Sequence, residues 1–234
     1  MKAKVEQFLL GDGNIEKNKS FFLISGNEET LINNITDKII QSLNPKGNKE
    51  VIKKYSEEIN KSQIEQNSVS LFENTKILVF HQPKKIDLEV FENQSDDLFI
   101  IIQDTRIKNN SEVKKWFDKS PNAYAISCYK LSPELKKNLL SVYTSKNNIK
   151  INKNSFWYFL ENTDDRYGIF NSEINKLGLH QNTSLSEKNI KELLASSHSE
   201  EAEKIFFLLS DNNKKIITET SRSINSAEMA YKVI

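Results

Sequence analysis

The chain has 234 residues, of which 37% are hydrophobic and 28% are charged, as in globular proteins and unlike disordered ones. Its 33 Lys and Arg residues nearly balance 32 Asp and Glu residues, whereas a protein that holds DNA by itself usually carries a basic surplus. The single cysteine, Cys128, excludes an internal disulfide, and no sequence stretch approaches the roughly 20 apolar residues of a membrane span.

The first part of the chain alternates short apolar runs with longer helical stretches. Near-continuous apolar strands separated by helices indicate a parallel sheet covered on both faces, and therefore an α/β domain. A helix is expected after the first run, because Leu31, Ile35 and Ile39 recur at helical spacing. The predicted strands are residues 21–25, 76–80, 98–102 and 123–129, with 51–55 as a weaker edge strand.

The pattern changes after Tyr129. Ser132, Pro133 and Glu134 form a helix start, with an N-cap, a proline at the first helical position and an acid in the first turn. From there on, apolar residues recur at helical spacing and no strand is predicted. We therefore expect residues 1–141 to form the α/β domain and residues 142–209 a small all-α domain.

The turn after the first strand can be compared with a phosphate-binding loop. A working loop reads Gly-x-x-x-x-Gly-Lys-Ser/Thr, and its backbone amides and lysine hold the phosphates. Here the turn reads Gly26-Asn27-Glu28-Glu29, with no second glycine and no lysine. The two glutamates lie where a helix N-terminus would attract an anion, so they should repel a phosphate. This degenerate loop should not bind ATP.

Other catalytic arrangements are also missing from the sequence. The second predicted strand ends in His81 and Gln82, where a nucleotide hydrolase would carry a magnesium-binding acid. Asp104 is a possible replacement, although a helix cap is the more common role of such a residue. His81, His180 and His198 lack metal-ligand spacing, and Cys128 lies on a predicted buried strand. We expect no catalytic residue, no metal site and no cofactor.

Several segments carry a further signal through their order and spacing across residues 20–209. They are 22–29, Ser70-Leu71-Phe72 followed by the strand 76–80, 111–117, 125–129, 131–133 and 173–177. Together these segments resemble the delta subunit of the bacterial DNA polymerase III clamp loader, an AAA+-like protein. The resemblance implies an AAA+-like (RecA-like) parallel-sheet domain, a helical lid domain and a helical collar, of which residues 210–234 would be only the beginning.

The resemblance assigns clamp binding to Ser70, Leu71 and Phe72. In the family, an equivalent Leu-Phe pair inserts into a hydrophobic pocket of the beta sliding clamp, and one clamp interface opens. Polar residues flank the pair in this sequence, as expected for an exposed apolar anchor. The alternative is that Leu71 and Phe72 fill the domain core before the next strand.

The resemblance also implies the partners and the setting. These are the beta clamp, the gamma or tau ATPase subunits, delta prime and, only within the assembled complex, primer–template DNA, with no membrane. The chain would be a non-hydrolysing subunit of a DNA-directed DNA polymerase (nucleotidyltransferase) holoenzyme in the cytoplasm. Because the collar would be truncated, assembly into a pentameric loader is doubtful, whereas clamp binding by the first domain is not.

Two other functions remain open. One is a nucleotide-binding P-loop-type phosphohydrolase with an atypical loop. The other is a helical DNA-binding adaptor that uses lysine pairs, although such pairs on helices are more often solvated faces. The pairs are Lys114-Lys115, Lys136-Lys137 and Lys214-Lys215.

Overall fold

The computed structural model describes residues 2–11, 15–16, 18–68, 75–92, 98–179 and 185–195. Six strands form one sheet in the order β1-β6-β2-β5-β4-β3, and all neighbours run parallel. The strands are β1 (Lys2–Ala3), β2 (Phe21–Gly26), β3 (Glu50–Tyr55), β4 (Lys76–His81), β5 (Leu98–Asp104) and β6 (Ala123–Cys128).

The predicted strands are confirmed, including the edge strand β3. Strand β1 was not predicted from the sequence; it pairs with β6 through Lys2–Ala125 and Ala3–Ile126. A strand of two residues is too short to show a periodic pattern, so only its tertiary pairing identifies it.

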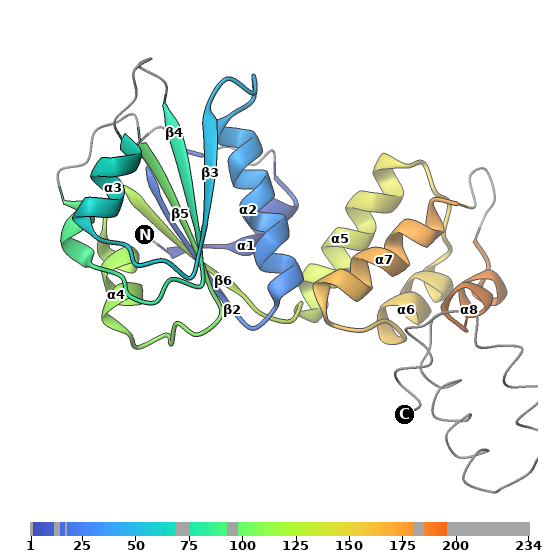
Figure 1. Cartoon of the computed structure of the whole chain (residues 1–234). Helices are drawn as coiled ribbons and strands as arrows, with labels where there is room; N and C mark the ends of the chain where they lie inside the picture. Colours follow the sequence, from blue (N-terminus) through green and yellow to red (C-terminus); the bar gives the residue numbers. More distant parts are fainter. Residues whose placement is uncertain are drawn as a thin grey trace, which may run out of the picture. The chain divides into compact units, whose positions relative to one another are not determined.

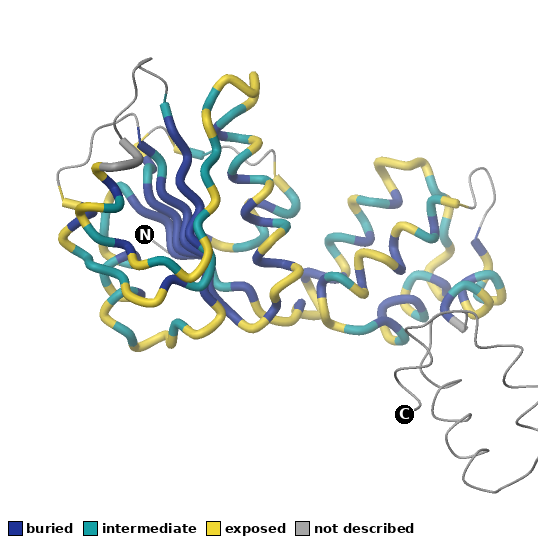
Figure 2. The backbone as a smooth tube through the Cα atoms, in the orientation of Figure 1, coloured by how far each residue is buried: buried dark blue, intermediate teal, exposed yellow. Residues whose placement is uncertain are grey.

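Helices cover both faces of the sheet (Figure 1). They are α1 (Val5–Leu9), α2 (Glu29–Leu43), α3 (Lys61–Ser68), the 3-10 helix η1 (Leu88–Phe91) and α4 (Glu112–Lys119). Figure 1 places α1 and α2 on one face and α3 and α4 on the other. Because strand side chains alternate in direction, Phe21 and Leu23 join the core beneath α4, which includes Phe117. Strands β2, β4, β5 and β6 are buried along almost their whole length, whereas the edge strand β3 is exposed or half-buried (Figure 2).

The chain divides into two compact units. The first comprises the described residues up to Asn147 together with Asp164–Ile174. It includes α5 (Pro133–Lys146), which begins as predicted because the Ser132 hydroxyl accepts a hydrogen bond from the Leu135 amide at 3.2 Å. It also includes most of α7 (Tyr167–Leu177).

The second unit comprises Asn148–Thr163 and the described residues from Asn175 onward. It contains α6 (Lys153–Glu161) and α8 (Glu187–Ala195), whose buried residues include Phe159 and Ile190. The side-chain oxygen of Asn152 caps α6 by accepting from the Ser155 amide at 2.8 Å. The division at residue 141 remains a prediction, and it falls inside α5. Residues 210–234 lie outside the described residues.

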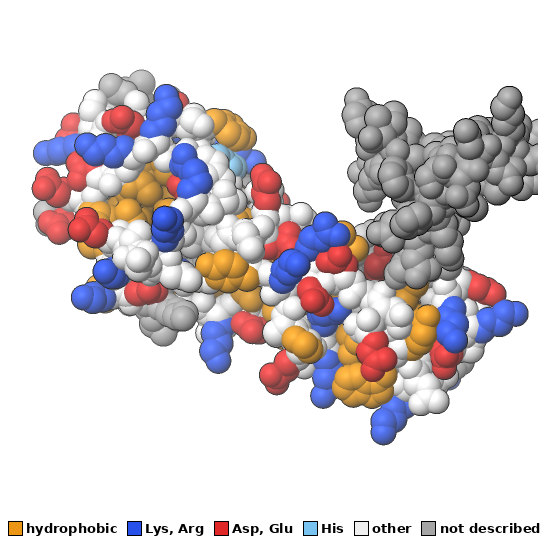
Figure 3. Space-filling model, turned by 90° about the horizontal axis from the view of Figure 1, so that it is seen from below, with side chains coloured by type: hydrophobic (Ala, Val, Ile, Leu, Met, Phe, Trp, Pro, Cys, Tyr) orange, Lys and Arg blue, Asp and Glu red, His pale blue; other side chains and the backbone are white. Residues whose placement is uncertain are grey.

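The lysine pairs differ from the solvated faces expected from the sequence. Lys114 is buried, and its ammonium group donates to the Ser127 hydroxyl at 3.0 Å. Lys136 is buried as well and pairs with the Asp165 carboxylate at 3.0 Å. Over the face shown in Figure 3, the described acidic and basic side chains are interspersed. One lysine of each of these two pairs therefore stabilises the fold, and Lys214 and Lys215 lie outside the described residues.

Gly26 ends β2 and lies opposite Cys128 of β6. Its φ of +147° is a conformation that side chains disfavour. A Cβ atom added there would lie 1.9 Å from the carbonyl oxygen of Cys128. Backbone, not a flexible side chain, blocks this position, so only glycine fits.

We therefore predict that Gly26→Ala lowers the free energy of unfolding by at least about 3 kcal/mol, because strand β6 must move. Gly47→Ala is the matched control. Gly47 also has a positive φ, +68°, but an added Cβ would meet no atom within 4 Å. It should cost only about 1 kcal/mol. Urea unfolding followed by circular dichroism measures both, and equal losses would contradict the backbone contact as the cause.

Candidate functional site

The turn between β2 and α2 leaves Asn27 and Glu29 exposed but buries Glu28. The amide of Glu28 donates to the Cys128 carbonyl oxygen at 3.2 Å, which fixes the turn against the end of β6. Glu28 is also the N-cap residue of α2, yet its side chain forms no capping hydrogen bond to that helix. The carboxylate is therefore free to act elsewhere.

The Glu28 carboxylate lies at the start of α7. Its Oε2 atom accepts a hydrogen bond from the backbone amide of Tyr167, the first residue of that helix, at 3.2 Å. A negative group at this end of a helix is stabilised by the unpaired amides and by the helix dipole. The glutamate caps α7, a contact across 139 positions of sequence.

The first turn of α7 also packs against the first turn of α2. A Cβ atom added at Gly168 would lie 2.8 Å from the Cγ2 atom of Thr30. The N-terminal turns of the two helices are thus in direct contact, and Glu28 supplies an anion to one of them. A nucleotide phosphate here would meet a buried carboxylate and a neighbouring helix, which argues against phosphate binding.

Arg166, just before the start of α7, is matched by a carboxylate. Arg166 donates to Asp164 through its Nη2 atom at 2.7 Å and its Nε atom at 3.0 Å. This pairing lowers the pKa of Asp164 to about 2 and raises the pKa of Arg166, with a further contribution to the arginine from Glu28. The guanidinium is therefore committed to Asp164, and this turn provides no unmatched arginine for a phosphate.

The end of β4 carries His81 and Gln82, and neither supplies the acid that a magnesium site needs. The His81 ring stacks on the exposed ring of Tyr55, with centroids 4.5 Å apart and planes 10° apart. Burial and the nearby Lys53 lower the pKa of His81, which favours the neutral imidazole at pH 7. Gln82 donates its side-chain amide to the Thr105 hydroxyl at 3.0 Å. Both side chains thus make structural contacts at the carboxyl end of β4.

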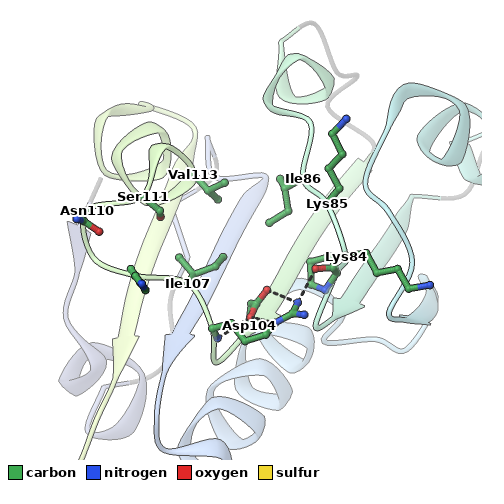
Figure 4. Close-up of a pocket in the computed structure, with 11 residues that line it drawn as sticks. Lys84, Lys85, Ile86, Asp104, Ile107, Asn110, Ser111 and Val113 are labelled. Carbon is green, nitrogen blue, oxygen red and sulfur yellow. Dashed lines mark hydrogen bonds and ion pairs between the residues drawn. The ribbon is translucent and has the colours of Figure 1, made fainter.

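Asp104, the possible replacement acid, is buried and fully engaged by Arg106 (Figure 4). The carboxylate accepts from the Arg106 backbone amide at 2.8 Å, from Nε at 3.0 Å and from Nη2 at 2.9 Å. Nη2 also donates to the carbonyl oxygen of Pro83 at 2.6 Å. Asp104 therefore anchors Arg106, and Arg106 joins the two loops. Within the described residues, no group of three His, Cys, Asp or Glu side chains could hold a metal ion.

Cys128 is a buried thiol, as its position on β6 predicts. Burial raises its pKa to about 12, and this effect outweighs the opposite influence of Lys114. A thiol with so high a pKa is a poor nucleophile at neutral pH. The residues predicted to bind a clamp, Ser70, Leu71 and Phe72, lie outside the described residues. His180 and His198 lie outside them as well. No described helix is long and apolar enough to cross a membrane.

Comparison with known proteins supports the predicted fold. No family model matches the sequence, and no curated protein matches it. The structure is similar to the Bacillus subtilis DNA clamp loader delta protein, with a TM-score of 0.63 and 12% identity over 98% of this chain and 74% of that chain. At this identity the likeness shows the fold alone, and it confirms the AAA+-like fold and the structural resemblance to delta.

Two solved structures are less similar. The Thermotoga maritima RuvB Holliday junction branch migration motor has a TM-score of 0.46 and 10% identity over 80% of this chain and 67% of that chain. Domain III of the Thermotoga maritima replication initiation protein DnaA has a TM-score of 0.44 and 13% identity over 82% of this chain and 95% of that domain.

We predict that Glu28→Ala lowers the free energy of unfolding by about 1–2 kcal/mol, because the Tyr167 amide loses its acceptor. Glu28→Gln should lose clearly less, since its amide oxygen can still accept the same hydrogen bond. Urea denaturation of both variants gives the comparison. A Glu28→Ala variant as stable as the original chain would contradict the role of Glu28 in holding α7.

We also predict that ATP with magnesium leaves the melting temperature of the chain unchanged. A ligand at a hundred times its dissociation constant would add about 2.7 kcal/mol of stability, which a thermal shift assay detects readily. The expected result follows from the buried Glu28 carboxylate. A saturable rise in melting temperature with ATP would contradict it and favour the P-loop-type phosphohydrolase.

Proposed function

We propose that this chain is a delta-type subunit of the bacterial DNA polymerase III clamp loader, one that binds and opens the beta sliding clamp without hydrolysing ATP. The observation that carries the proposal is the structural similarity to the Bacillus subtilis clamp loader delta protein over 98% of this chain. The Glu28 carboxylate at the start of α7 supports the part of the proposal that excludes ATP hydrolysis, because a non-hydrolysing subunit does not need a phosphate site. The balanced charge fits a subunit that meets DNA only in an assembly.

The clamp-binding element in this proposal is Ser70-Leu71-Phe72, between the end of α3 and the start of β4. Leu71 and Phe72 are adjacent large apolar residues with polar neighbours. Full burial of each in a partner pocket contributes about 1.5–3 kcal/mol, so the pair contributes roughly 3–6 kcal/mol. A nanomolar complex needs about 12 kcal/mol. Further contacts from the same edge of the domain must therefore contribute.

Opening the clamp requires a difference between two affinities. A ligand shifts an equilibrium only as far as it binds one state more tightly, and equal affinity for closed and open clamps shifts nothing. We propose that Leu71 and Phe72 favour the open clamp. The energy to reset the cycle would come from ATP hydrolysis by gamma or tau subunits, and delta prime would complete the ring. We propose that the complex acts in the cytoplasm.

We predict that Leu71→Ala combined with Phe72→Ala weakens binding to a purified bacterial beta clamp by at least about a hundredfold, because both apolar anchors are lost. Surface plasmon resonance with immobilised clamp measures the dissociation constant. The melting temperature of the double variant should stay unchanged. If Leu71 and Phe72 filled the domain core instead, the melting temperature would fall.

The matched control removes two exposed apolar side chains elsewhere, Val142→Ala with Leu179→Ala. This variant should bind the clamp as the original chain does. Unchanged affinity of the Leu71/Phe72 variant would contradict the clamp-binding element, and a marked fall in its melting temperature would instead assign the pair to the domain core.

A further inference from the structure

An open hollow of about 560 Å³ lies at the carboxyl edge of the sheet, between the loops that follow β4 and β5. The lining comes from two segments. The loop after β4 contributes Lys84, Lys85 and Ile86, and the segment from β5 to α4 contributes Arg106, Ile107, Lys108 and Val113. The proposed clamp-binding segment precedes β4, whereas the hollow follows β4. Strand β4 therefore separates the two features along the chain.

The inner walls of the hollow are apolar. Ile86, Ile107 and Val113 converge on it from different segments (Figure 4). All three are only partly buried, and they pack against the hydrophobic core of the sheet. The exposed parts of these apolar side chains contact solvent, and their buried parts pack against the core. Such a surface suits one inserted aliphatic or aromatic side chain.

The shape of the hollow is fixed in advance by Arg106. Its guanidinium binds Asp104 on its own loop and the Pro83 carbonyl oxygen on the other loop, at 2.9 Å and 2.6 Å from Nη2. Arg106 thus joins the two loops, and the hydrogen bond from Gln82 to Thr105 joins them as well. A preformed site needs little ordering when it binds a partner, which favours affinity.

The rim of the hollow is basic. Lys84, Lys85 and Lys108 are exposed, and none forms an ion pair within the described part of the chain. In Figure 4 the side chains of Lys84 and Lys85 extend outward from the lining. The charge of Arg106 is matched by Asp104, so the three lysines give the rim its positive character. Their positions fit carboxylates on either side of an inserted apolar residue.

We propose that this hollow binds an acidic peptide segment of a partner protein, with one apolar side chain inserted between Ile86, Ile107 and Val113 and with flanking carboxylates near the lysines. A nucleic acid strand fits less well, because none of the described lining residues is aromatic and bases would lack a stacking surface. A small anion would use the lysines but not the apolar walls. Together, the apolar walls and the basic rim favour an acidic peptide with one apolar side chain over a nucleic acid strand or a small anion.

The test is a fluorescence anisotropy titration of the full chain with a synthetic labelled peptide that carries one central leucine among aspartates. Binding should be saturable, with a dissociation constant on the order of 10 µM at low salt. A second peptide with serine in place of the leucine should bind at least about tenfold more weakly, a difference of about 1.4 kcal/mol. The peptide pair tests the apolar walls without any change to the protein.

A charge-reversal variant, Lys84→Glu with Lys85→Glu, tests the rim and should weaken binding of the leucine peptide at least about tenfold. The matched control is Lys46→Glu with Lys115→Glu, because both lysines are exposed, unpaired in the described part of the chain and outside the hollow. The control should bind as the original chain does, and both variants should keep their melting temperature.

Three results would overturn the proposal. The first is no saturable binding of the leucine peptide up to about 1 mM. The second is equal binding of the leucine and serine peptides, which would reduce the hollow to a nonspecific basic surface. The third is tighter, Lys84- and Lys85-dependent binding of a labelled oligothymidylate, which would assign the hollow to nucleic acid. None of these outcomes depends on clamp binding, so the hollow and the proposed clamp contact can fail separately.

Discussion

The hydrogen bond from the Tyr167 amide to the Glu28 carboxylate is the contact on which the arrangement of this site depends. It joins the turn after β2 to the start of α7, and Thr30 and Gly168 pack beside it. The same carboxylate provides the negative charge that a helix start favours, so the site has no need of an external anion. One residue thus stabilises the fold and, through its negative charge, is predicted to disfavour a phosphate at this turn. The structural and the functional consequence have the same physical cause.

Several features were predictable from the sequence because their signals are local. The strands ending at Gly26 and Asp104 are near-continuous apolar runs, and Ser132 and Pro133 mark a helix start within three residues. The turn Gly26-Asn27-Glu28-Glu29 can also be compared with a phosphate loop from the sequence alone, although its inability to bind phosphate stays a prediction. In each case the physical interaction connects neighbouring residues, so the pattern and the structure agree.

The features that sequence reasoning missed depend on distant partners. Lys114 donates to Ser127, and Lys136 pairs with Asp165, 29 positions away, so neither burial could be read from a helix pattern. The capping role of Glu28 requires knowledge of where α7 begins, 139 positions later. The hollow combines a loop after β4 with a loop after β5, and only the adjacency of those strands brings the loops together. Long-range pairing, not residue type, decides all of these.

In the proposed role, the loss of the phosphate site has a mechanistic consequence for the whole cycle. A subunit whose loop already holds its own carboxylate keeps the same local structure whatever the nucleotide state of its neighbours. Its affinity for a clamp can then change only if partner subunits expose or cover its binding surface, because no ligand shifts its own equilibrium. The fixed pairing of Glu28 with α7 therefore makes this domain a constant element, and regulation must come from what is bound around it.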